Sequence, residues 1–167
     1  MSIQSICVNT LPEKPDCPDH LDYTIQFPVP KSEINTLRRF TEKVERLFGV
    51  KVVLTAVVPG IEGEEAQELI QVSSKHRKRD EAEKAEEYCE NLCKGKYQEC
   101  IVCPTRFYDK LRQGQEAIER ETRVVVVLTK ESEILVQASD KDKLMKVKGQ
   151  MEDLVQKVKQ EIKNENA

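Results

Sequence analysis

The segment PTRFYDKLRQGQEAIERETRVVVVL, residues 104 to 128, decides the fold because the chain contains a version of it twice. PKSEINTLRRFTEKVERLFGVKVVL, residues 30 to 54, aligns with it without a gap, and the offset from Pro30 to Pro104 is 74 residues. Ten identical pairs in one ungapped frame exceed what common residues match by chance, so the sequence predicts one structural unit used twice. The identical pairs are Pro30/Pro104, Leu37/Leu111, Arg38/Arg112, Glu42/Glu116, Glu45/Glu119, Arg46/Arg120, Val50/Val124, Val52/Val126, Val53/Val127 and Leu54/Leu128.

Each copy predicts the order strand, helix, strand, strand, helix from its apolar periodicity. The first copy has expected strands at 23–29, 51–58 and 68–73, a helix that stops at Gly49, and a helix at 80–92. The second has expected strands at 98–103, 124–130 and 134–138, and helices at 105–121 and 141–162. Because strands joined by hairpins pair antiparallel, we expect an α+β fold of two tandem β-α-β-β-α units, each a three-stranded antiparallel sheet with helices on one face.

The repeat predicts three parts in the 167-residue chain: an irregular leader at 1–22, a first unit at 23–95 and a second unit at 96–167. A net charge of −3 with 38% hydrophobic residues indicates neither a strongly basic nucleic-acid binder nor an acidic disordered chain, so any basic surface must be local. The sequence has no membrane-length apolar run and no signal-peptide pattern, which predicts no membrane association. We expect a cytoplasmic location, with the nucleus or a ribonucleoprotein granule as alternatives.

The two units resemble the eukaryotic (type I) KH domain. The resemblance rests on a strand ending in Val-Pro or Cys-Pro, a helix and strand reading EKVERLFGVKVVL or EAIERETRVVVVL, a hairpin and a final helix. In that family a G-x-x-G loop divides the first helix and clamps about four nucleotides. Arg39-Phe40 and Gln113-Gly114 stand where the loop should begin, so the resemblance implies degenerate loops, with Gly114 as a remnant. If Gly114 is helical, its replacement by alanine would stabilise the helix by up to about 1 kcal/mol.

Within KH-like proteins, KVERLFGVKVVL followed by EAEKAEEYCENLC is most similar to a tandem module without G-x-x-G. This module is found at the N-terminus of the Nedd4-binding-protein-1 and KH-and-NYN-domain endoribonuclease family. The resemblance implies a non-enzymatic module in RNA regulation, with no cofactor. Such a module would bind single-stranded RNA weakly through basic side chains, or serve as adaptor for a ribonuclease or another protein of an RNA-decay complex. The alternative is a protein-interaction or homodimerisation scaffold without RNA binding.

Basic side chains supply the candidate contacts to RNA or a partner, because lysine and arginine neutralise phosphates. The densest run is KHRKR at Lys75–Arg79, between a strand and a helix, for which a solvated turn is the alternative interpretation. GIEG at Gly60–Gly63 matches G-x-x-G as a string, but its acidic neighbours repel phosphate and predict a hairpin turn. The candidate residues are Arg38, Arg39, Lys75, His76, Arg77, Lys78, Arg79, Lys110 and Arg112.

Four cysteines, Cys89, Cys93, Cys100 and Cys103, have a spacing that zinc sites also use. We expect no metal, because Cys103 takes the place of Val29 in the repeat and cysteine readily packs as a small hydrophobe. Zinc remains the alternative. The two histidines, His20 and His76, have no identifiable nucleophile partner, so the sequence predicts a protein that is not an enzyme.

Overall fold

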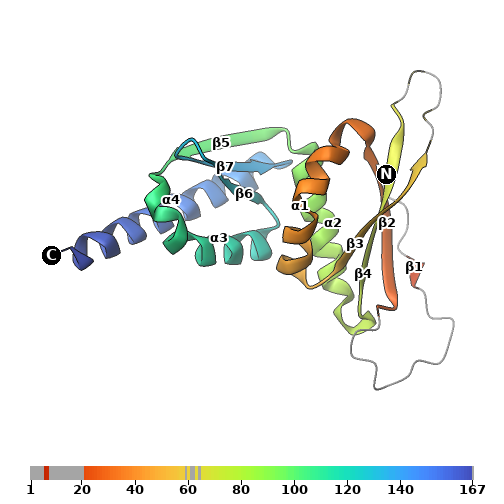
Figure 1. Cartoon of the computed structure of the whole chain (residues 1–167), viewed down its shortest axis with the longest axis horizontal. Coiled ribbons are helices and arrows are strands. Elements are labelled where there is room, and N and C mark those ends of the chain that lie inside the picture. Colours follow the sequence, from red (N-terminus) through yellow and green to blue (C-terminus); the bar gives the residue numbers. More distant parts are fainter. Residues whose placement is uncertain (1–5, 8–20, 59, 61–62, 64, 167) are drawn as a thin grey trace. The chain divides into compact units, whose positions relative to one another are not determined.

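The computed structural model describes residues 6–7, 21–58, 60, 63 and 65–166. The chain forms two compact units, Met1–Cys89 and Glu90–Ala167. The division falls inside helix α2 (Arg79–Lys94), whereas the sequence placed it after residue 95. Each unit builds its own antiparallel sheet and packs helices on it, so the predicted α+β fold class is confirmed (Figure 1).

The first unit has a sheet of order β1-β2-β4-β3, with α1 and α2 on the same side of it (Figure 1). The two-residue strand β1 (Ile6–Cys7) adds an outer strand to the three that the sequence predicts. Helix α1 (Ile34–Phe48) ends at Gly49, which has a left-handed φ of 65°, as a glycine stop signal predicts. The strands are β2 (Tyr23–Pro30), β3 (Lys51–Val58) and β4 (Gln67–Ser74).

The second unit repeats this arrangement in a sheet of order β5-β7-β6. Its apolar core joins both helices to one sheet face through residues such as Leu111, Val126, Ile134 and Leu144. A helix of one turn (Thr105–Phe107) precedes α3, as Lys31–Glu33 precedes α1. The elements are β5 (Tyr97–Val102), α3 (Tyr108–Thr122), β6 (Val125–Leu128), β7 (Glu133–Ala138) and α4 (Lys141–Glu165).

Strand register is the same in both units, which is a stricter similarity than element order. Val52 pairs with Val72 in the first sheet, and Val126 pairs with Val136 in the second. Tyr23 pairs with Ser74, and Tyr97 pairs with Ala138. Since a one-residue slip would move every side chain to the opposite face, the shared register keeps the same positions in the core of both units.

An identical glutamate links the end of the first helix to the next strand in each unit. Glu119 is fully buried, and its Oε1 accepts a hydrogen bond of 2.8 Å from the backbone N–H of Val126. Glu45 accepts the equivalent bond of 2.9 Å from the N–H of Val52. In the second unit, Gln115 Nε2 also donates to Val126 O at 2.9 Å and to the other Glu119 oxygen at 3.2 Å. Helix side chains thus satisfy backbone groups of the edge strands β3 and β6.

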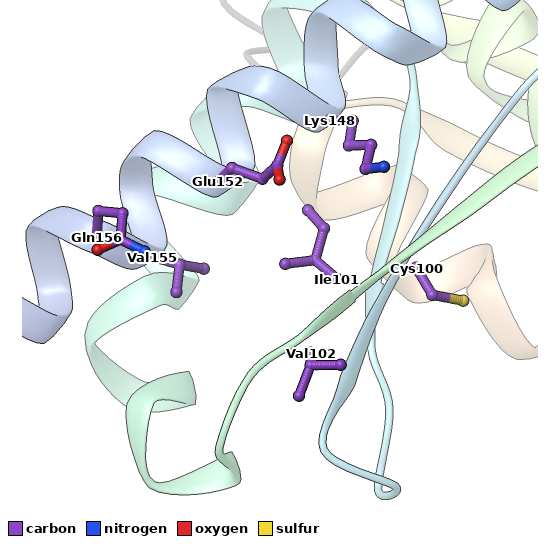
Figure 2. Close-up of a pocket in the computed structure, with 7 residues that line it drawn as sticks. All are labelled: Cys100, Ile101, Val102, Lys148, Glu152, Val155 and Gln156. Atoms are coloured by element: carbon purple, nitrogen blue, oxygen red, sulfur yellow. The ribbon is translucent and has the colours of Figure 1, made fainter.

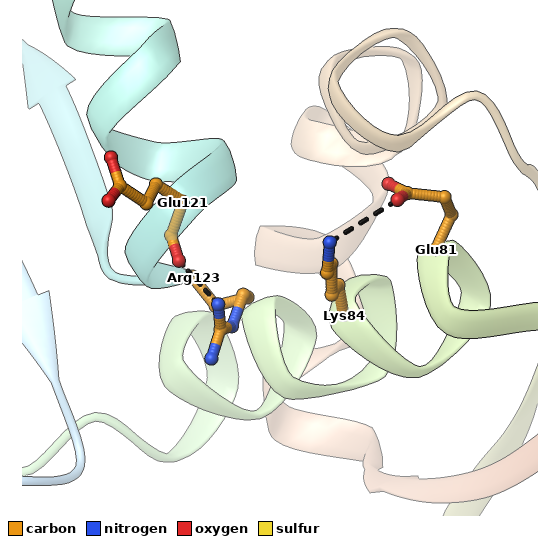
Figure 3. Close-up of polar contacts among 4 residues, drawn as sticks. All are labelled: Glu81, Lys84, Glu121 and Arg123. Atoms are coloured by element: carbon orange, nitrogen blue, oxygen red, sulfur yellow. Dashed lines mark hydrogen bonds and ion pairs between the residues drawn. The ribbon is translucent and has the colours of Figure 1, made fainter.

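Arg123 takes the place of Gly49 in the repeat and adopts the same left-handed conformation, with φ 61°. The backbone N–H of Arg123 donates to Glu119 O at 2.7 Å, as that of Gly49 donates to Glu45 O at 2.8 Å. The Arg123 side chain donates back to Glu121 O (Figure 3). Asn91 Nδ2 donates a hydrogen bond of 2.7 Å to Arg123 O. These hydrogen bonds stabilise the left-handed conformation of Arg123, which glycine adopts at a lower energetic cost.

Gly114 lies inside the unbroken helix α3, next to α4. A Cβ added at Gly114 would come within 2.9 Å and 3.0 Å of the two terminal methyl carbons of Leu154. Alanine at Gly114 therefore requires the end of the Leu154 side chain to shift, and this shift offsets part of the expected gain in helix stability. Close approach of two helices gives Gly114 a structural purpose that does not require a former RNA loop.

We predict that Glu119→Ala destabilises the protein by about 2–4 kcal/mol, because it leaves the buried N–H of Val126 without its acceptor and opens a cavity. Glu119→Gln keeps an acceptor oxygen and should cost at least about 1 kcal/mol less. Urea unfolding of both variants measures the difference. Equal destabilisation by the two substitutions would show that the hydrogen bond contributes nothing.

A second prediction concerns the helix crossing at Gly114. Gly114→Leu should destabilise the protein by about 1–3 kcal/mol through overpacking against Leu154. In the Gly114→Leu, Leu154→Ala double variant, the space vacated at Leu154 should recover at least half of that loss. A double-mutant cycle from urea unfolding measures this coupling, and additive effects would contradict the contact.

Candidate nucleic-acid interface

The basic segment Lys75–Arg79 lies where β4 ends and α2 begins. Its residues 76–78 form one turn of 3-10 helix that leads directly into α2. Lys75 is half-buried, whereas His76 to Arg79 are exposed. The extended conformation of Lys75 turns the chain out of the sheet, so the segment stands on the surface at the start of a helix. This exposure is required for phosphate contact.

A carboxylate from a distant residue caps the one-turn helix at residues 76–78. Asp22 Oδ1 accepts a hydrogen bond of 2.6 Å from the backbone N–H of His76. The His76 ring packs edge-on against Tyr23 at 6.1 Å between centroids, and its Nε2 lies 3.3 Å from Arg79 Nη1. Asp22 lies at the end of the predicted leader, to which the sequence assigned no role. Because Asp22 and His76 are 54 residues apart, no local sequence pattern indicates that Asp22 caps this helix.

Acidic residues follow the basic segment along α2. Asp80 and Glu81 lie in the first turn, where the helix dipole favours negative charge. Glu81 Oε1 forms an ion pair of 3.3 Å with Lys84 (Figure 3). Within the described ranges, neither Arg77 nor Lys78 forms an ion pair with a carboxylate. These two side chains are therefore the best placed of the segment to reach an external phosphate.

The structure does not bring Arg38 and Arg39 to the basic segment. Both are exposed on α1, and Arg38 lies 3.9 Å from Glu68, near the beginning of β4. Lys75 follows the other end of β4. Because this strand has eight residues, the pair Arg38–Glu68 and Lys75 lie roughly 20 Å apart. The first unit therefore carries two separate basic regions.

Lys110 and Arg112 lie on α3 of the second unit, and both are exposed. Lys110 Nζ forms a 2.7 Å ion pair with Glu165 Oε1, and this hydrogen bond raises the pKa of Lys110. Lys110 thus has an internal carboxylate partner. Arg112 lies at the position of Arg38 in the repeat.

The positions expected for the KH loop lie inside helices in both units. Arg39 and Phe40 belong to α1, and Gln113 and Gly114 belong to α3. Neither helix is divided, so the backbone N–H groups there are engaged in helical hydrogen bonding and do not face a phosphate. Of the GIEG string, Ile61 and Glu62 lie outside the described residues, while Gly63 has a left-handed φ of 83°.

The four cysteines occupy different environments. Cys89, Cys93 and Cys103 are buried, whereas Cys100 is exposed. Cys103 belongs to the core of the second unit, and burial raises the pKa of its thiol. Cys100 is on the opposite face of β5, because successive side chains of a strand alternate. No group of three or more metal-ligating side chains occurs among the residues that the structure describes.

Comparison with known proteins finds no family model that matches the chain and no matching curated protein. In the described part of the chain, no helix has the length and apolar character needed to span a membrane.

We predict that Cys100 reacts with iodoacetamide at neutral pH well before Cys103. Cys100 is exposed, whereas Cys103 is buried and the raised pKa of its thiol reduces the reactive thiolate. Peptide mapping by mass spectrometry measures each site, with urea-unfolded protein as the control for full reactivity. Protection of both thiols that a chelator removes would instead indicate a metal site.

Proposed function

We propose that this protein is a non-enzymatic, tandem KH-like module in RNA regulation that binds RNA phosphates weakly through basic side chains. The observation that carries the proposal is the exposed segment Lys75–Arg79 at the start of α2. The two β-α-β-β-α units support the KH-like part, and the unbroken helices α1 and α3 support contact without a glycine loop.

The geometry of the basic segment specifies how RNA would be held. The Asp22 carboxylate occupies the N–H of His76, so a phosphate has to be bound by side chains. Lysine and arginine side chains read the charge of the backbone and little of the base sequence. The acidic residues Asp80 and Glu81 reduce the local positive potential. The proposed binding is therefore weak, tolerant of sequence and dependent on salt.

A second candidate function is that of an adaptor for a protein partner in an RNA-processing or RNA-decay complex. Exposed apolar side chains on β5 of the second unit favour it: Val102 is 81% exposed and Tyr97 is 40% exposed. Exposed apolar residues on an edge strand are typical of protein contacts. The two functions use different surfaces, so one chain can perform both.

We predict that binding to a single-stranded RNA weakens by roughly tenfold or more between roughly 50 and 200 mM salt, as expected for contacts that release several counterions. Replacing Lys75, Arg77, Lys78 and Arg79 together with glutamate should abolish binding at either salt concentration. Fluorescence anisotropy with a labelled RNA of mixed sequence measures both effects, and circular dichroism confirms that the variant is folded.

The matched control reverses the same number of charges elsewhere. Lys141, Lys146, Lys157 and Lys159 are exposed on α4, and their replacement with glutamate should weaken binding much less. Equal loss in the two variants would show that only total charge matters. Tight, salt-insensitive binding by either variant would contradict the proposed mode of contact.

A further inference from the structure

The outer edge of β5 is an unpaired strand edge in the second unit. The sheet order β5-β7-β6 leaves β5 bonded on one side only among the described residues. The N–H of Cys103 donates to Ser132 O toward β7, and these groups alternate in direction along a strand. Gln98, Cys100 and Val102 therefore present their N–H and C=O groups to the open edge.

The first unit protects the equivalent edge of β2 in two ways. Strand β1 pairs with its beginning, where Ile6 lies opposite Thr24. Farther along, the N–H of Lys31 points toward the β4 side, where it donates to Ala66 O, so Pro28 and Pro30 occupy positions whose backbone faces outward. Proline has no N–H to offer another strand, which blunts an edge.

Among its described residues the second unit has no added strand, and it keeps one of the two prolines, Pro104 at the position of Pro30. Val102 takes the place of Pro28 in the repeat, and no strand of the described residues pairs with the β5 edge. The edges β3 and β6 are protected differently, since Glu45 and Glu119 accept hydrogen bonds from their backbones. Because native proteins usually protect such edges, an open edge carrying an 81% exposed valine indicates a docking strand.

A pocket of about 320 Å³ lies beside this edge, between β5 and α4 (Figure 2). Cys100, Ile101 and Val102 line one side, and Lys148, Glu152 and Gln156 from successive turns of α4 line the other. The Lys148 ammonium lies 3.8 Å from the Glu99 carboxylate. A strand added to β5 would thus meet a cationic and an anionic side chain of α4 in turn.

We propose that β5 pairs antiparallel with β5 of a second copy of this chain. Two-fold pairing centred on Cys100 uses all three outward-facing residues, since Cys100 meets Cys100 and Gln98 meets Val102. Centring on Glu99 would instead set two glutamates directly opposite each other, which is unfavourable, and would leave Val102 unpaired. The sheets of the two copies then form one continuous sheet.

Charge complementarity supports a second copy as the occupant. Lys148 lies at the level of Glu99, and Glu152 lies one turn farther along α4, toward Val102 (Figure 2). The two-fold axis at Cys100 places the level of Lys148 in one copy opposite the level of Glu152 in the other. Lys148 of each copy then approaches Glu152 of the other, which forms two equivalent ion pairs across the interface.

The test is the oligomeric state of the full chain by sedimentation equilibrium between about 1 and 100 µM, a range suited to micromolar affinity. The unaltered chain should form dimers. Val102→Pro should weaken dimerisation by about tenfold or more, because the two-fold axis removes two N–H donors at once. The matched control Val102→Thr keeps the N–H and the branched side chain and should still dimerise. A monomer throughout this range, or an unchanged dimer in folded Val102→Pro, would overturn the proposal.

A second measurement tests the register of the pairing and does not require a proline variant to fold. In a Cys7→Ser, Cys17→Ser background, mild oxidation should link Cys100 to Cys100, because paired strands place their Cα atoms about 5.5 Å apart, within disulfide range. Moving the thiol by Cys100→Ser with Gln98→Cys should prevent the link, because residue 98 then faces Val102. Equal linking at both positions, or none at Cys100, would contradict the proposed pairing. Neither experiment involves RNA, so its outcome is independent of the proposed function.

Discussion

The hydrogen bond from the backbone of the second strand to a glutamate near the end of the first helix is the constraint on which each unit depends. Glu45 and Glu119 sit in the last turns of α1 and α3, and each accepts the N–H of a valine two residues into the next strand region. The left-handed residue between them, Gly49 or Arg123, reverses the chain so that this bond can form. Helix end, turn and strand start are thereby held in one geometry, which positions the sheet against the helix.

This constraint also explains why the repeat tolerates change where it does. The hairpin after the linked strand differs by ten residues between the units, as the pairing of Ser74 with Tyr23 and of Ala138 with Tyr97 shows. The register on both sides of the hairpin is nevertheless shared. Because helix and strand are already fixed by the glutamate, the loop can shorten without moving a core side chain to the opposite face.

The two units differ in how the outer edges of strands β2 and β5 are protected. The first unit has β1 and two prolines along β2, whereas the second has Val102 where the first has Pro28. The proposed RNA contact also belongs to one unit, since the segment after β4 is basic and the corresponding stretch after β7, Ser139–Lys143, contains two aspartates. Duplication of one fold has left each unit with a different exposed surface, and we propose a different contact for each.

The sequence by itself determined the element order, the repeat and most element boundaries, because these follow from local periodicity and stop signals. Strand β3 spans Lys51–Val58 and α1 ends at Gly49, both as predicted. Only the tertiary structure decided what Asp22, Gly114 and Val102 do. Asp22 caps a one-turn helix 54 residues away, Gly114 leaves room for the Leu154 side chain, and Val102 lies on an edge that no strand of the described residues pairs with. Each of these three roles depends on which segments meet in the folded protein. A local sequence pattern does not predict a contact with a residue that is distant in the sequence.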